Sequence, residues 1–111
     1  MCTRDAVAMA TASAASAPVF THPDMMRSNR QVALVVGGSA SVRCEARGSP
    51  APAVVWYKDD AILEHQVTWS LELRHVTVED GGLYVCVVYN HVGSIDFSYN
   101  LIVKSISVSQ F

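Results

Sequence analysis

The run Asp80-Gly81-Gly82-Leu83-Tyr84-Val85-Cys86 decides the fold, together with Cys44 and Trp56 upstream of it. The tyrosine stands two residues before the second cysteine, and the tryptophan lies between the two cysteines. Four kinds of residue at these spacings are typical of a sandwich of two antiparallel β-sheets. They therefore predict an all-β fold and argue against most classes of enzyme.

Length and composition agree with a small binding domain. The chain has 111 residues, of which 50% are hydrophobic, so it can bury one modest core. It holds no uncharged apolar run near the roughly 18 residues that a membrane helix needs. The formal net charge of −2 provides no basic field that would attract nucleic acid.

The cysteine, tryptophan and tyrosine pattern resembles that of immunoglobulin domains, in which a tryptophan packs on a disulfide between the sheets. The resemblance implies a Cys44–Cys86 disulfide and a core signature formed by Trp56, Asp80, Gly82 and Tyr84. Such a bridge would close a loop of about 42 residues and contribute roughly 4 kcal/mol. It favours an oxidising compartment, although intracellular immunoglobulin domains can keep the same cysteines reduced.

Composition divides the chain into three parts. Residues 1–17 are rich in Ala, Ser and Thr and are expected to form a disordered leader, with a degenerate signal peptide as the alternative. Within this leader, Cys2 is expected to be a free thiol. Residues 18–104 are expected to form the domain, and residues 105–111 a linker stub.

Alternating apolar residues separated by turn residues predict a series of short strands. The strands are expected at 18–21, 32–36, 39–46, 53–58, 67–74, 83–90 and 94–104, with a helical turn within 24–30. The stretch 62–67 is too short for the two strands that normally fill it. One middle strand should therefore be shortened or missing, which leaves the strand that contains Trp69 at a sheet edge.

A narrower resemblance is to I-set immunoglobulin domains, and within them to the second immunoglobulin-like domain of fibroblast growth factor receptors. The I-set match rests on Gly48-Ser49-Pro50-Ala51-Pro52, Trp56, the Asp80–Cys86 run, Asn90 and Gly93. The receptor match rests on Phe20-Thr21-His22-Pro23, Thr68-Trp69-Ser70-Leu71, and Cys86-Val87-Val88-Tyr89-Asn90 with Gly93-Ser94-Ile95.

The receptor resemblance implies capture of a growth factor and of heparan sulfate outside the cell. By position, the growth-factor residues are Gln31, Ala33, Val35 and Lys104, with Ile106 where the receptors carry an arginine. The heparan sulfate residues by the same reasoning are Arg27, Arg30 and Arg43. A membrane attachment would come only from a parent chain.

A second candidate surface follows from the strand pattern and is independent of the resemblance. Six apolar side chains should point outward from one face of the same sheet: Val55, Tyr57, Val85, Val87, Tyr89 and Ile102. Scattered surface hydrophobic residues are common and need no explanation. Six together, two of them tyrosines, favour a protein-binding or self-association face.

No pattern in the chain predicts catalysis, a metal site or a cofactor. The four histidines, at 22, 65, 75 and 91, lack the spacing of metal ligands, and no serine lies in a nucleophile elbow. We therefore expect an extracellular binding module from a receptor-like protein. The alternative is a structural or adhesion module, either at the cell surface or in an intracellular filament protein.

Overall fold

Short strands fill most of the chain that the computed structural model describes, which is residues 14–63 and 68–105. Along the chain the elements are β2 (Ser16–Phe20), α2 (Pro23–Ser28), β3 (Gln31–Val35), β4 (Ala40–Arg43), β5 (Ala46–Ser49), β6 (Ala53–Lys58), β7 (Ala61–Ile62), β8 (Ser70–Leu73), the 3-10 helix η2 (Val78–Asp80), β9 (Gly82–Tyr89) and β10 (Ser94–Lys104). Ser16 and Ala17, predicted to belong to the leader, are part of β2.

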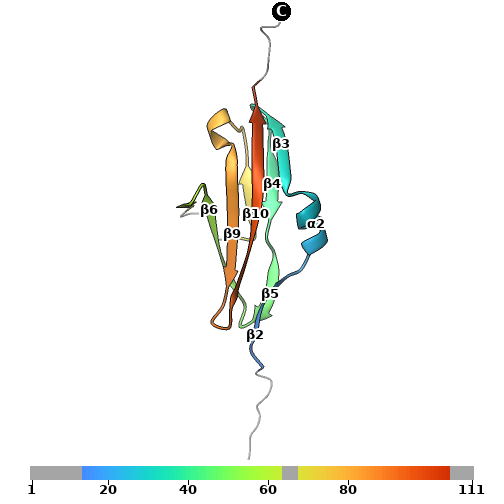
Figure 1. Ribbon diagram of the computed structural model, residues 1–111, viewed down its shortest axis with the longest axis vertical. Helices are drawn as coiled ribbons and strands as arrows, with labels where there is room; N and C mark the ends of the chain where they lie inside the picture. The colour runs from blue at the N-terminus through green and yellow to red at the C-terminus, as the bar shows by residue number, and fades with distance from the viewer. Residues whose placement is uncertain (1–13, 64–67, 106–111) are drawn as a thin grey trace, which may run out of the picture.

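The strands form two layers (Figure 1). One is a five-stranded sheet in the order β3-β10-β9-β6-β7, in which β3 runs parallel to β10 and the other pairs are antiparallel. The pairs β2–β5 and β4–β8 form the opposite layer. This is the predicted all-β immunoglobulin-like sandwich.

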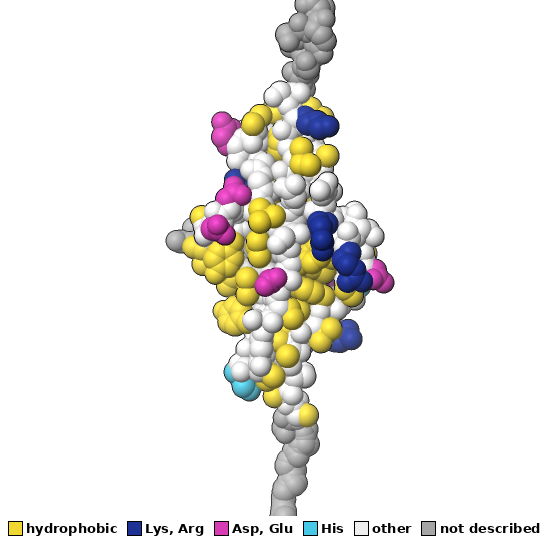
Figure 2. Space-filling model, viewed as in Figure 1, with side chains coloured by type: hydrophobic (Ala, Val, Ile, Leu, Met, Phe, Trp, Pro, Cys, Tyr) yellow, Lys and Arg dark blue, Asp and Glu magenta, His cyan; other side chains and the backbone are white. Residues whose placement is uncertain are grey.

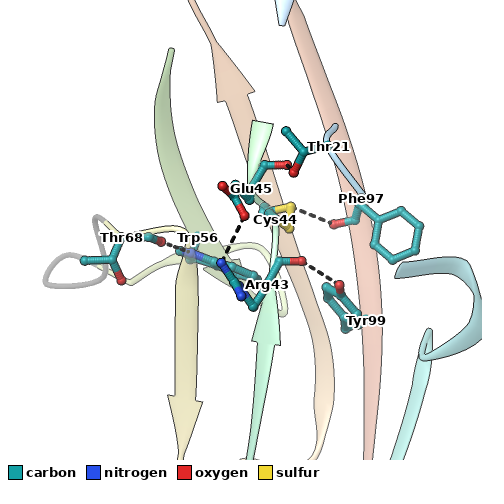
Figure 3. The surroundings of a disulfide bond; sticks show 9 residues. Thr21, Arg43, Cys44, Glu45, Trp56, Thr68, Phe97 and Tyr99 are labelled. Carbon is teal, nitrogen blue, oxygen red and sulfur yellow. Dashed lines mark hydrogen bonds and ion pairs between the residues drawn. A yellow bond between two sulfur atoms is a disulfide. The ribbon is translucent and has the colours of Figure 1, made fainter. Parts of the chain in front are cut away.

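A disulfide joins the two layers at the centre of the core. Cys44 and Cys86 are bonded, their Cα atoms are 6.5 Å apart, and both side chains are fully buried (Figure 3). Trp56 is also fully buried, and its indole N–H donates to the Thr68 carbonyl at 2.9 Å. On its other side the Tyr99 ring stacks at a centroid distance of 6.5 Å. The predicted bridge and buried tryptophan are confirmed.

The middle of the chain departs from the predicted strands in two places. The single strand expected at 39–46 is divided into β4 and β5, and β5 continues to Ser49, inside the predicted turn. It continues because it pairs with β2, where Gly48 permits a close approach: a Cβ there would lie 3.2 Å from the Pro18 Cα. The shortened strand is confirmed within residues 14–63 and 68–105, in which β7 has two residues and β8 pairs only with β4.

Asn90 holds the N-terminal strand against the end of β9. Its side-chain amide donates to the carbonyl oxygens of Ser16 at 2.8 Å and of Pro50 at 3.0 Å. Its side-chain oxygen accepts from the backbone N–H groups of Val92 and Gly93. One side chain thus connects three segments that are distant in sequence, which accounts for an asparagine at this position of the motif.

The tyrosine of the Asp80–Cys86 run is hydrogen-bonded to nearby backbone. The Tyr84 hydroxyl donates to the Asp80 carbonyl at 2.5 Å. The Asp80 carboxylate accepts from the Thr77 backbone N–H at 2.8 Å, as in a capping box. No basic side chain among the described residues forms an ion pair with Asp80. Arg43 pairs instead with Glu45.

Asp59 makes a contact that the sequence did not predict. Its carboxylate accepts from the Leu83 backbone N–H at 2.9 Å and from the Lys58 ammonium at 2.9 Å. These two groups, the backbone N–H foremost, hold the pKa of the Asp59 carboxyl below its ordinary value. The contact requires glycine next to it, because a Cβ on Gly82 would lie 2.6 Å from an Asp59 oxygen and the Gly82 φ is +144°.

We predict that Gly82→Ala lowers the free energy of unfolding by about 2 to 4 kcal/mol, because strain at positive φ adds to the clash with Asp59. The matched control is Gly37→Ala, since Gly37 also has a positive φ, +91°, but open space around it. Its cost should be only about 1 kcal/mol. Urea unfolding of both variants measures the difference, and equal losses would contradict the clash.

A second prediction concerns Tyr84. Burial, followed by the nearby Asp80 and Asp59 carboxylates, raises the pKa of Tyr84 from 10.0 to about 12. The native state therefore holds this proton more tightly than the unfolded state. The resulting stability is complete below pH 10 and is lost as the pH rises toward 12.

Tyr84→Phe should cost about 1 kcal/mol at neutral pH, because the hydrogen bond to Asp80 is lost. The gap between wild type and variant should close as the pH rises above 10 and should reverse before pH 12, because a rise of the pKa to about 12 is worth more than the ~1 kcal/mol at stake. Urea midpoints measured across this range test the prediction. A gap that stays constant with pH would contradict it.

Candidate binding surface

The outer face of the five-stranded sheet follows from strand alternation around the buried core. On β9, Tyr84, Cys86 and Val88 are buried, so the residues between them point away from the core. On β6, Val54 and Trp56 are buried in the same way. The register places Val55 opposite Val87 and Tyr57 opposite Val85. These four half-buried side chains form two adjacent cross-strand pairs.

Five of the six predicted face residues come together, and we call Val55, Tyr57, Val85, Val87 and Tyr89 the outer patch. Tyr89 is 44% exposed and lies on β9 opposite Ala53 of β6. On the face drawn in Figure 2, hydrophobic side chains gather over β6 and β9. Lys and Arg side chains lie to one side of them, toward β3 and α2.

Ile102, the sixth predicted residue, lies on β10 of the same sheet and is 38% exposed. The last paired residues of β9 and β10 are Gly82 and Leu101, so Ile102 lies beyond the end of β9. Its neighbour across the register is Ala33 on β3. Because Ile102 alternates with buried Leu101, it points outward, two residues along β10 from Asn100, which lies opposite Leu83.

Two apolar residues that the sequence did not single out extend the outer patch. Leu83 is 43% exposed and precedes Val85 in the same alternation along β9. Ile62 is 52% exposed and stands opposite Tyr57 on β7. The alternation could have identified Leu83, whereas Ile62 required knowledge of the β6–β7 pairing. On the β10 side, the polar Asp96 and Ser98 lie opposite Val87 and Val85.

The residues predicted to bind growth factor lie along one edge of the same sheet. Gln31, Ala33 and Val35 are exposed on β3, the edge strand. Lys104 is the neighbour of Val35 across the β3–β10 register. The structure therefore brings these four residues together at the sheet edge. Ile106 lies outside the described residues.

The three predicted heparan sulfate arginines do not form one free basic strip. Arg27 pairs with Asp24 within α2, and Arg43 pairs with Glu45 at 3.0 Å. Arg30 lies over the Phe97 ring, 5.2 Å from its centroid, and has no acidic partner among the described residues. Arg43 is on β4 in the opposite layer. Two of the three charges are thus already balanced by a carboxylate.

A groove of about 320 Å³ separates α2 from β4. Met25 and Met26 line it from the helix, and Val42 and Arg43 line it from the strand. His22 and Glu45 close one end, with 3.7 Å between the imidazole and the carboxylate. The apolar lining suits a hydrophobic side chain better than a sulfate group.

Neither a metal site nor a membrane helix emerges from the part of the chain that the structure describes. No three His, Cys, Asp or Glu side chains within residues 14–63 and 68–105 could hold a metal ion together. None of the described helices is long and apolar enough to span a bilayer.

Comparison with known proteins places the chain among binding modules. The family model described as "Immunoglobulin domain" matches residues 18–90. Fibroblast growth factor receptor-like 1 of Mus musculus is 39% identical over 91 residues, which cover 76% of this chain and 17% of that protein. Roundabout homolog 1 of Homo sapiens is 38% identical over 91 residues, which cover 78% of this chain and 6% of that protein.

Solved structures agree on the fold. A chimeric titin Z1Z2 structure superimposes with a TM-score of 0.71 at 26% identity, covering 84% of this chain and 99% of the other. A Dscam structure superimposes with a TM-score of 0.69 at 32% identity, covering 81% of this chain and 25% of the other. The chain spans less than a fifth of the length of the receptor-like and Roundabout relatives.

Proposed function

This chain belongs to the immunoglobulin domain family, and we propose that it binds a protein partner through the outer patch on its five-stranded sheet. Its relatives include fibroblast growth factor receptor-like 1 and Roundabout homolog 1. It is a binding module and not an enzyme.

The observation that carries the proposal is the continuity of the outer patch. Val55, Tyr57, Val85 and Val87 occupy successive cross-strand pairs, so their side chains touch the same solvent-facing area. Tyr89 and Leu83 extend it along β9 and are both more than two-fifths exposed. Aromatic and aliphatic residues with few charges are the composition of an interface core.

A finer proposal assigns growth-factor binding to the β3–β10 edge. The exposed row Gln31, Ala33 and Val35 is next to Lys104, as the receptor resemblance requires. The edge strand runs parallel to β10, so both strands end where the chain leaves the domain. A ligand at this edge would therefore contact the following linker as well. The linker departs from the receptor pattern at Ile106.

Heparan sulfate is a weaker second ligand in this proposal. Arg30 is the predicted cation without an acidic partner among the described residues. Exposed Arg47, on β5, adds a charge that the sequence did not single out. A basic strip with fewer free cations binds a polyanion more weakly, and its affinity depends less on salt. We therefore expect elution from heparin only slightly above physiological salt, and elution below physiological salt would remove heparan sulfate as a ligand.

We propose that this domain lies outside the cell, as part of a longer receptor-like or adhesion protein. The disulfide at its centre is the support, because such bonds persist in oxidising compartments. The alternative of an intracellular structural module rests on the similarity to titin domains. Non-reducing mass spectrometry of native material separates the two, since free thiols at Cys44 and Cys86 would favour the filament protein.

We predict that the two surfaces respond to different substitutions. The affinity is measured by surface plasmon resonance, with fibroblast growth factors flowed over the immobilised domain. Val35→Glu should lower this affinity about tenfold, because a desolvated charge then opposes the ligand. Val87→Lys should leave this affinity unchanged. The matched control is Glu72→Lys, because Glu72 is an exposed residue of β8 in the opposite layer.

A growth-factor affinity that falls with Val87→Lys and not with Val35→Glu would move the ligand to the outer patch and end the edge assignment. No measurable growth-factor binding would remove the finer proposal. The protein-binding role of the outer patch is tested separately, by a pull-down from cell-surface extracts with wild-type and Val87→Lys domains. Identical capture by both would contradict it.

A further inference from the structure

We infer that the occupant of the outer patch is a second copy of this chain, related by a two-fold axis that runs along β9. This inference rests on the proposed function, because it names the partner of the same surface. Three features of the described residues support it: the central position of β9, the charges at the two sheet edges, and the level at which those charges lie.

The strand order places β9 in the middle of the sheet, between β10 and β6. Its outward residues are all apolar: Leu83, Val85, Val87 and Tyr89. A two-fold axis lying in the interface along this strand would stack each of these residues near its own equivalent. Such an interface is self-complementary, as a closed dimer requires.

The two edges of the sheet carry opposite charges. Arg30 immediately precedes β3 at one edge, and Asp60 lies in the β6–β7 turn at the other. Both are exposed. Among the described residues neither forms an ion pair, although Arg30 lies over Phe97. Each edge thus presents a charge that has no counter-ion in the described part of the monomer.

The register shows that these charges lie at the same level along the strands. Gln31, next to Arg30, is opposite Asn100, and Asn100 is opposite Leu83. The Leu83 N–H in turn donates to Asp59, the neighbour of Asp60. One row across the sheet therefore begins beside Arg30 and ends beside Asp60.

Rotation by half a turn about an axis along β9 exchanges the two edges and keeps the level. It places Arg30 of one copy over Asp60 of the other, and the same pair forms a second time on the opposite side. An axis across the strands would change the level and would not bring the two charges together. Charge complementarity therefore selects both the partner and the direction of the axis.

Asp96 opposes the dimer. It lies opposite Val87 on β10, inside the area that the second copy would cover. Burying an unpaired carboxylate is unfavourable, so the natural chain should form a weak dimer. Neutralising this side chain should strengthen association, which is the reverse of what most interface substitutions do.

Sedimentation velocity of the full chain, from micromolar to millimolar concentration, tests the inference. We expect a concentration-dependent dimer that Val87→Lys abolishes and Asp96→Asn tightens several-fold. Arg30→Glu and Asp60→Lys should each weaken it about tenfold, and the double variant should recover most of the affinity. Arg74→Glu, on the opposite layer, is the matched control and should leave the dimer unchanged.

The variants are checked for folding by thermal melting, because Asp60 has a φ of +74°. If Asp60→Lys does not fold, Arg30→Gln, Asp60→Asn and their combination replace the charge reversals. Their effects should then be less than additive. A monomer at every concentration, or a charge reversal without recovery, would overturn the inference. If the chain stays monomeric while Val87→Lys still loses cell-surface partners, the proposed function stands and the second copy does not.

Discussion

The Cys44–Cys86 bridge with Trp56 against it is the constraint on which the rest of the structure depends. The bridge ties β9 to the connection between β4 and β5 in the opposite layer, at the centre of the core, where all three side chains are fully buried. Because Cys86 points inward, strand alternation makes Val85 and Val87 face outward. The outer patch is therefore a direct consequence of the core.

A second constraint connects the β6–β7 turn to β9. Asp59 accepts the Leu83 N–H, and only glycine at position 82 leaves room for its carboxylate. This contact holds the turn beside the start of β9 and so sets the level at which Asp60 lies. The position of the Asp60 charge at the edge of the sheet therefore depends on the hydrogen bond between Asp59 and Leu83, which is part of the fold itself.

The two proposed surfaces share one sheet and meet at β10. A growth factor would cover the β3–β10 edge, whereas a second copy would cover the faces of β9 and β6 and bring Arg30 into the interface. Gln31 lies where the two areas meet. A growth factor and a second copy of the chain should therefore compete only for the end of β3 that contains Gln31. Val35 and Lys104, at the other end, should stay accessible.

The spacing of Cys44, Trp56, Tyr84 and Cys86 determined the fold class, the buried signature and the direction in which most of the outer residues point, because alternation on a strand is a local property. The pair of Arg27 with Asp24, three residues apart in a helix, could have been predicted from spacing. Tertiary structure decided the rest. Ile62 joins the outer patch only through the β6–β7 pairing. The row from Arg30 to Asp60 arises from strand register, which spacing along one chain does not encode.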